Sequence, residues 1–346
     1  MARLSDVPRV IRRVGLFKFS ARVWNEVGED HLLTWGAALA YSWLFSVFPF
    51  LIFLLTLVPY LPDNAIEAAK KQIPESLHYY LASNAADAIW DNIRWVIDKP
   101  QGGLLSLGLI VTIWAASGGV NMTMTALDRC YEVEKGRGIV KRRVIAIGLT
   151  VIVASLVLLV LLLIPIGNLG TKYALKYWDE KGWSYSIWVV YLWNAARYAL
   201  ALTLMFGVVG IMYRYGVAVK QRFRWFSPGA VFTIGVWLLL SFVFRFYVNQ
   251  FGKESYSRTY GTVGGVAVLL LFFYLDALVL MLGAEINSEI DYEVLGVPRG
   301  SLDFTVTPEE MIVERSMPSA PPVGAPQVLG GGELRRGGTQ VGGGRT

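Results

Sequence analysis

Six long apolar segments constrain this chain more than any other feature of its sequence. The clearest is 144–167, which consists almost entirely of Val, Ile and Leu. A helix needs about 20 apolar residues to cross the hydrocarbon core of a bilayer. Of the 346 residues, 54% are hydrophobic and only 17% are charged. A soluble globule of this size could not bury so many hydrophobic side chains. We predict an all-α, integral membrane six-helix bundle with amphipathic interfacial and periplasmic helices. The predicted spans are about 32–60, 103–125, 144–167, 187–213, 228–249 and 261–286.

Residues 1–30 combine apolar and basic side chains at helical spacing. Val7 and Val10 belong to an apolar stripe, and Arg12 and Arg13 lie between its members. This pattern is typical of an amphipathic helix that lies on the inner membrane face with its basic side toward anionic lipid. A surface helix packed on the bundle is the alternative. We treat 1–30 as a separate N-terminal element, cytoplasmic or interfacial.

The membrane domain, 31–290, contains polar segments of different kinds. Residues 62–101 are polar but patterned, which predicts an ordered external cap of two helices, the first ending before Pro74. Residues 168–186 are rich in Tyr and Trp and predict a loop in the aromatic belt of the bilayer. The cytoplasmic tail, 291–346, has nine Gly and four Pro in its last 30 residues. That composition predicts a largely disordered tail.

Basic residues are distributed unequally between the two sides of the predicted bundle. Segments on one side hold 16 Lys and Arg in 60 residues, and those on the other hold 9 in 74. Cytoplasmic loops carry the excess of Lys and Arg in membrane proteins, so both termini are predicted to be cytoplasmic. The segments compared are 1–30, 128–143 and 214–227 on the first side, and 61–103, 168–186 and 249–260 on the second.

Two ionisable residues fall deep within the predicted spans, where charge is costly and a function is the default expectation. Arg197 lies about 10 residues into the fourth span, or ~15 Å from its outer end. Asp276 lies about 15 residues into the sixth span, or ~22 Å from the same side. We predict an intramembrane polar site of Arg197, Asp276 and Asn194, with Arg197 and Asp276 paired. The alternatives are that each faces a separate polar seam, or that Asp276 pairs with a hydroxyl group.

Further polar residues lie at the ends of two spans. Asp128 and Arg129 end the second span, and Glu285 and Asn287 lie at the inner end of the sixth. The four are predicted to meet at a cytoplasmic mouth of the bundle. The alternative is that water simply hydrates them.

Proline and glycine residues mark features of helix geometry in two spans. Pro49 lies inside the first span and predicts a kink, because proline frees a backbone carbonyl. Gly261 and Gly265 form a GxxxG pattern at the start of the sixth span, which predicts close helix packing rather than a nucleotide loop.

Residues for catalysis or metal binding are sparse. Cys130 is the single cysteine, so an intramolecular disulfide and a cysteine-ligated metal site are excluded. His31 and His78 lack the spacing of metal ligands, and the acidic residues do not cluster as ligands. We therefore predict no metal, no cofactor, no nucleic-acid partner and no enzymatic activity.

Several stretches resemble the BrkB/YihY family of bacterial inner-membrane proteins. They are AALAYSWLFSVFPFL at 37–51, ALDRCYEV at 126–133, the Ser-Pro-initiated span at 227–248, YGTVGG at 260–265 and LVLMLGAEIN at 278–287. The resemblance covers roughly residues 30–290. It implies a six-span protein of the bacterial inner membrane with an unsettled biochemical role. Some members carry virulence or serum-resistance labels, and an older label, ribonuclease BN-like, is not supported by any carboxylate cluster here.

The function we expect is binding or transport of a lipid or another anionic amphiphile. A central arginine can hold a phosphate or carboxylate headgroup bidentately, and Arg197 has a suitable depth. Membrane lipids are then the expected partners. The alternative is a non-transporting scaffold that binds an envelope protein through 62–101, and a membrane enzyme ranks third. Substrate, direction, energy coupling and oligomeric state are left open by the sequence.

Overall fold

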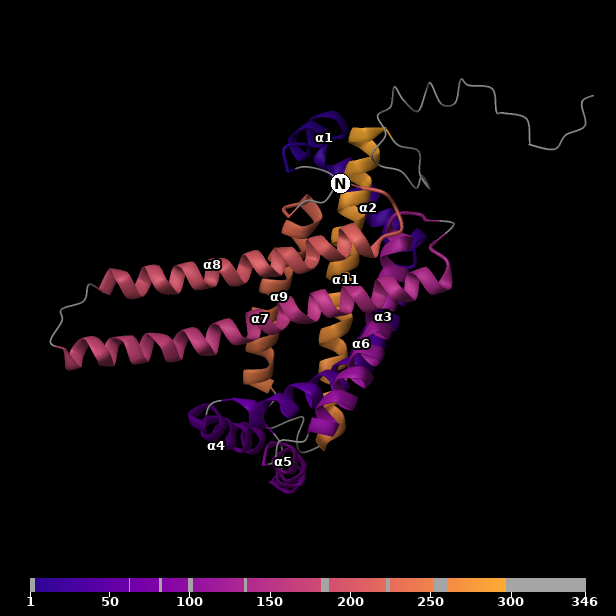
Figure 1. The fold of residues 1–346 in the computed structure, drawn as a ribbon. Helices are drawn as coiled ribbons and strands as arrows, with labels where there is room; N and C mark the ends of the chain where they lie inside the picture. The colour runs from indigo at the N-terminus through magenta and orange to yellow at the C-terminus, as the bar shows by residue number, and fades with distance from the viewer. Residues whose placement is uncertain are drawn as a thin grey trace, which may run out of the picture. The chain divides into compact units, whose positions relative to one another are not determined.

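The computed structural model of this chain is built from helices. It describes residues 4–61, 63–80, 83–98, 102–133, 136–181, 187–221, 225–251 and 261–296, and these residues contain helices and no strands (Figure 1). The predicted all-α architecture is therefore confirmed. The helices are α1 Val7–Val14, α2 Leu16–Glu29, α3 Leu32–Leu57, α4 Asp63–Tyr80, α5 Ser83–Ile97, α6 Gly102–Cys130, α7 Ile139–Glu180, α8 Ile187–Ile211, α9 Pro228–Phe251 and α11 Gly261–Leu295, with short turns η1 Val58–Tyr60 and η2 Met212–Gly216.

Six helical segments are long and apolar enough to cross a membrane, as the sequence predicted. Each segment falls on one of the predicted spans, with ends that shift by at most eight residues, and most of its surface is not covered by other helices. In a bilayer, a helix can expose apolar side chains to the surrounding lipid because its backbone hydrogen bonds are made within the helix. The segments are Leu32–Tyr60, Gly108–Cys130, Ile139–Leu163, Trp188–Gly216, Pro228–Phe246 and Gly265–Val294.

The N-terminal segment forms two helices rather than the single one predicted. Gly15 separates α1 from α2 with φ +88°, a left-handed conformation that glycine adopts without strain. Val10 of α1 packs against Ile290 of α11, so α1 lies on the bundle as an ordinary surface helix would. On α2, by contrast, Phe17 and Trp24 are strongly exposed, and an interfacial position for this helix stays a prediction.

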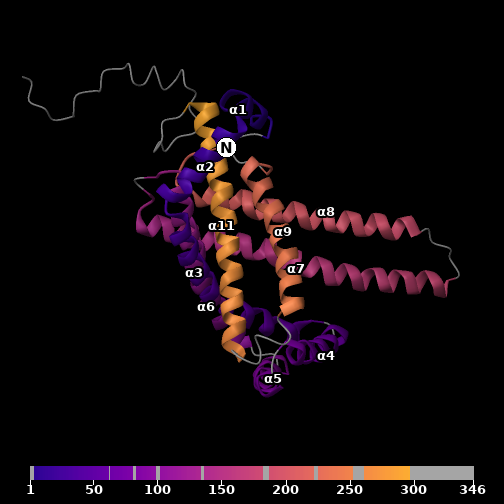
Figure 2. The same cartoon turned by 180° about the vertical axis from the view of Figure 1, so that it is seen from behind.

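The cap consists of α4 and α5, close to where two helices were predicted. The structure corrects one boundary, because α4 runs through Pro74 to Tyr80 instead of ending before the proline. Two side-chain pairs join the cap helices: Lys70 Nζ lies 2.7 Å from Asp98, and His78 lies 3.0 Å from Asp87. The cap is at one end of the helices, and α1, α2 and the last turns of α11 are at the other (Figures 1 and 2).

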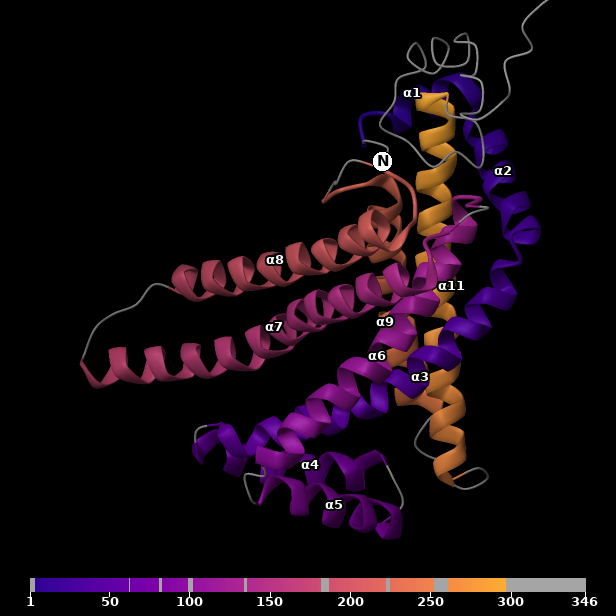
Figure 3. The same ribbon diagram turned by 45° about the vertical axis from the view of Figure 1, so that its right-hand side comes forward.

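The aromatic segment predicted as a loop, 168–186, is helical as far as Glu180. Helix α7 therefore has 42 residues. The prediction ended the span where hydropathy falls, but a helix does not have to end there. Its polar turns keep helical spacing, and Lys176 pairs with Glu180 one turn later at 3.8 Å. Helices α7 and α8 run side by side and extend away from α9 and α11 (Figure 3).

The bundle is organised around α11. It contacts α3 and α9 most extensively, and α3 also packs along α6. Helices α9 and α11 approach each other closely at Gly229 and Gly283, where a Cβ on either residue would collide with the other's backbone. The packing contact predicted at Gly265 is not made, since a Cβ there would meet nothing within 4 Å. Gly261 begins α11 in the structure, but its surroundings lie outside the described side chains.

Pro49 lies inside α3 without ending the helix. Its carbonyl oxygen accepts a hydrogen bond from Thr112 Oγ1 of α6 at 2.8 Å. The proline turn is therefore fastened to the neighbouring helix.

Candidate functional site

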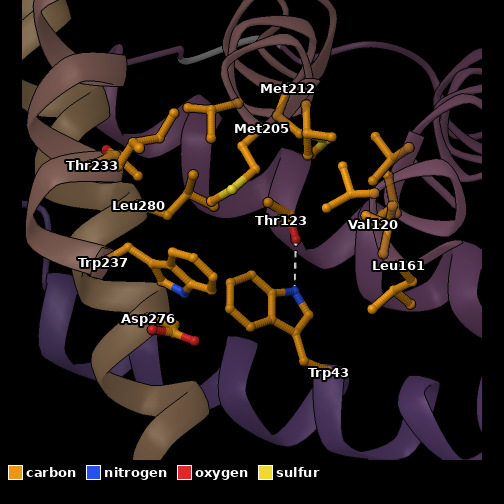
Figure 4. A pocket seen from close by; sticks show the side chains of 16 residues that line it. Trp43, Val120, Thr123, Leu161, Met205, Met212, Thr233, Trp237, Asp276 and Leu280 are labelled. Carbon is orange, nitrogen blue, oxygen red and sulfur yellow. Dashed lines mark hydrogen bonds between the residues drawn. The ribbon is translucent and has the colours of Figure 1, made fainter. Parts of the chain in front are cut away.

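A cavity of about 530 Å³ lies between six helices of the membrane domain. Its sixteen lining residues come from α3, α6, α7, α8 with η2, α9 and α11, and they are mostly Val, Leu, Ile, Met and Trp (Figure 4). This volume falls within the range of small-molecule pockets, which is roughly 300–1,000 Å³. An apolar cavity within membrane spans suits a hydrocarbon group.

Most hydrogen-bonding groups of the cavity wall are satisfied within the protein. Trp43 Nε1 donates to Thr123 Oγ1 at 3.0 Å (Figure 4), and Thr123 in turn donates to the carbonyl of Gly119. Thr233 Oγ1 hydrogen bonds with Tyr213 at 2.7 Å, and it also lies 3.3 Å from the carbonyl of Val279. These side chains therefore present mainly carbon to the cavity.

Asp276 is the charged residue of the cavity lining. Its carboxyl lies beside the indole of Trp237 (Figure 4). The Oδ1 atom is buried without a hydrogen-bond partner, and Ser241, one turn beyond Trp237 on α9, has a hydroxyl in the same condition. Buried polar atoms normally have partners, so the Asp276 carboxyl can accept a hydrogen bond from a group bound in the cavity.

Arg197 does not pair with Asp276 in the described residues. Its Nη2 donates to Asn194 Oδ1 at 3.0 Å, and its guanidinium lies 5.2 Å from the ring centre of Tyr198. The side chain is only 4% exposed, and its Cδ and Nη1 occupy the space above Gly167 of α7. The pair predicted from depth is not made because α8 packs on α7 and α9, whereas Asp276 faces α9 from α11. Arg197 and Asn194 do meet, as neighbours one turn apart on α8.

Arg197 is nevertheless aligned with the cavity. It shares one stripe of α8 with Met205 and Val208, which line the cavity together with Met212 at the start of η2. Eight residues separate Arg197 from Met205, or ~12 Å along the helix. A charged group therefore lies two turns from the apolar cavity on the same helix face.

The four residues predicted at a cytoplasmic mouth divide into two structural groups. Asn287 caps α9: its Oδ1 accepts from the Gly229 N–H at 2.8 Å, and its Nδ2 donates to Ser227 Oγ at 3.0 Å. Asp128 accepts from the Ala218 N–H at 2.7 Å and lies 3.4 Å from Arg142. Both residues fasten chain segments together.

Glu285 and Arg129 lie with a third residue that the sequence analysis missed. The carboxyl of Asp30, in the turn between α2 and α3, approaches Glu285 within hydrogen-bonding reach. Arg129 is near Asp30 and places its guanidinium 5.7 Å from the ring centre of Trp35. The position of Asp30 just before the first span was the available signal. Among the described residues, no group of three or more His, Cys, Asp or Glu is arranged to hold a metal ion.

Residues 23–301 match the family described as Virulence factor BrkB. The chain belongs to this family. The match covers most of the sequence and includes every described helix from α3 onward, so the predicted resemblance is confirmed. The protein is therefore a multi-pass membrane protein of the BrkB/UPF0761 family.

Two relatives illustrate the range of the family. The chain is 34% identical over 253 residues to YfkH of Bacillus subtilis, whose name calls it ribonuclease-like, covering 73% of this chain and 88% of the relative. It is 24% identical over 279 residues to a UPF0761 membrane protein of Tolumonas auensis, covering 79% and 85%. No solved structure matches the chain.

Proposed function

We propose that this BrkB-family protein binds an amphiphilic lipid within the membrane, as a step in lipid binding or transport. The observation that carries the proposal is the cavity of about 530 Å³ that lies between six helices and is lined almost wholly by apolar side chains. Burial of hydrocarbon against such walls favours association, at roughly 25 cal/mol per Å² of apolar surface. An acyl chain is the apolar group most abundant around a membrane protein.

The headgroup position in this proposal is Arg197. It lies two turns along the cavity stripe of α8, with Asn194 beside it. A guanidinium offers several N–H donors in one plane, which suits phosphate or carboxylate oxygens. An anionic amphiphile can thus place its chain in the cavity and its headgroup beside α7 and α8. We place the protein in the bacterial inner membrane with both termini in the cytoplasm, on the distribution of Lys and Arg.

The test is native mass spectrometry of the protein purified in a mild detergent. Met205→Trp adds a bulky side chain to the cavity wall, and Leu202→Trp adds it to an exposed position on the same helix. Arg197→Ala removes the proposed headgroup contact, and Arg245→Ala is its control on an exposed face of α9.

We expect a phospholipid on the wild type and on both controls, with strong loss from Met205→Trp. Arg197→Ala is expected to reduce the share of anionic lipid. Equal retention by the wild type and Met205→Trp contradicts the proposal.

A scaffold function is the second candidate, and one observation favours it. Trp95 of cap helix α5 is 62% exposed, and an exposed Trp is characteristic of protein interfaces. In that case an envelope protein is the partner, and the cavity variants leave its binding unchanged. The ribonuclease-like name of YfkH suggests a third function, RNA cleavage. Incubation of the purified protein with transfer RNA tests it directly.

A further inference from the structure

Two carboxyl groups from distant parts of the chain face each other at the N-terminal end of the bundle. Asp30 follows α2, and the left-handed conformation of the next residue, His31 with φ 53°, turns the chain into α3. This turn brings Asp30 against Glu285 of α11, within hydrogen-bonding reach. Glu285 is only 2% exposed. One oxygen of each carboxyl, Asp30 Oδ2 and Glu285 Oε1, is buried without a hydrogen-bond partner.

The surroundings of the pair are mainly acidic or neutral. Glu26 of α2 and Glu132, just after α6, add negative charge near Asp30, and Arg129 of α6 adds one positive charge. On the side of Glu285, the neighbours are the Cys130 thiol and Ser288, whose Oγ lies 3.4 Å from Glu285 Oε2. One arginine therefore stands against four carboxyl groups in this cluster.

Two carboxylates in such contact repel each other, and neither can donate a hydrogen bond to the other. One proton changes this, because a protonated carboxyl donates a short, strong hydrogen bond to its ionised neighbour. Burial raises the pKa of Asp30 to about 6. The cluster thus has the geometry and the surroundings in which carboxyl groups retain a proton near neutral pH.

We propose that Asp30 and Glu285 form a proton-binding site, in which one shared proton joins the α2–α3 turn to α11. We take the ligand to be a proton rather than a divalent metal ion, because no three His, Cys, Asp or Glu side chains among the described residues are arranged to hold a metal ion. The site is separate from the cavity and does not depend on the proposed lipid function. It is connected to the cavity through α11, since Glu285 lies nine residues, or ~14 Å, beyond Asp276.

Infrared difference spectroscopy of the purified protein between about pH 5 and about pH 8 tests the site, since these values bracket the Asp30 pKa. The wild type is expected to lose the C=O band of a protonated carboxyl as pH rises. Asp30→Asn and Glu285→Gln place a permanent amide donor in the pair, and each is expected to abolish that change. The control is Glu293→Gln, also on α11, because Glu293 pairs with Arg13 and Arg22 instead of an acid.

Thermal unfolding provides a second readout. A carboxyl whose pKa is raised by folding stabilises the protein below its unfolded pKa, and this contribution is lost as pH rises through the folded pKa. Asp30→Asn should therefore unfold several degrees above the wild type near pH 8, and this difference should shrink as pH falls through about 6 toward the unfolded pKa of about 3.9. The proposal is overturned if the wild type and both pair variants show the same spectral change. It is equally overturned if sodium chloride, but not choline chloride, removes the band at constant pH, since a metal cation then occupies the pair.

Discussion

Asn287 of α11 accepts a hydrogen bond from the backbone N–H of Gly229 at 2.8 Å and thereby caps the first turn of α9. The same amide donates to Ser227 Oγ, which accepts a further hydrogen bond from the Ala230 N–H at 3.2 Å. The start of one span is therefore closed by a side chain of another. This explains why Asn287, although polar, is completely buried.

Replacement of this cap is the first prediction. Asn287→Ala leaves the Gly229 N–H buried without an acceptor, which should lower the free energy of unfolding by about 1–3 kcal/mol. Asn287→Asp retains an acceptor and should lose less. Thermal unfolding in detergent, followed by circular dichroism, compares the two. Equal stability of Asn287→Ala and the wild type would show that water replaces the amide.

Alanine at two glycines of α11 gives a matched pair. A Cβ at Gly283 collides with Thr233, Tyr213 and the backbone of Gly229, whereas a Cβ at Gly265 meets open space. Gly283→Ala should destabilise the protein by at least about 1–3 kcal/mol, the usual cost of overpacking. Gly265→Ala should be neutral or stabilising by up to ~1 kcal/mol, because alanine favours the helix. If the two variants have equal melting temperatures, the close contact of α9 and α11 is absent.

A third prediction concerns the carboxyl in the cavity. Asp276 has a buried oxygen without a partner, and burial of such a group typically costs about 1–3 kcal/mol. Asp276→Leu should therefore raise the melting temperature of the purified protein. Thr233→Val is the control. It removes a hydroxyl that is already hydrogen bonded and should therefore lower the melting temperature. A fall in stability for Asp276→Leu would indicate that a bound group satisfies the carboxyl in the wild type.

The cap should loosen as pH rises. The Pro74 carbonyl, followed by the Asp87 carboxylate, raises the pKa of His78 above its ordinary value. The link from α4 to α5 through protonated His78 is therefore complete in acid and is lost as pH rises through that pKa. Limited proteolysis should cut His78→Gln faster than the wild type near pH 6 and at the same rate near pH 8.5, well above the usual histidine pKa of about 6.5. The comparison is the Lys70–Asp98 pair, in which the hydrogen bond from Lys70 lowers the pKa of the Asp98 carboxyl. Lys70→Met should therefore be cut faster than the wild type at both pH values. Equal cutting of His78→Gln and the wild type near pH 6 would contradict this.

The spans were predictable because exposing charge or unpaired backbone groups to hydrocarbon is costly wherever it occurs. Each span must therefore be apolar along its own sequence, whichever helices it packs against. The site was only partly predictable, because it depends on how each helix is rotated. Depth placed Arg197 and Asp276 close together, but their helices face different partners. Glu285 and Asn287 are two residues apart, which puts them about 200° apart around α11. One faces Asp30 and the other caps α9.

Helix α7, with 42 residues, is longer than a bilayer is thick. At 1.5 Å per residue the helix is ~63 Å long, and even a tilt of about 40° leaves a rise of ~48 Å, more than the roughly 40–45 Å of a bilayer with its headgroups. The surplus turns carry Lys172, Lys176 and Tyr177. If all six candidate spans cross the bilayer, successive spans alternate in direction, and we expect these turns on the same face of the membrane as α4 and α5. That topology predicts two separate helical projections in one aqueous compartment, where a macromolecule too large to enter the bilayer could touch both.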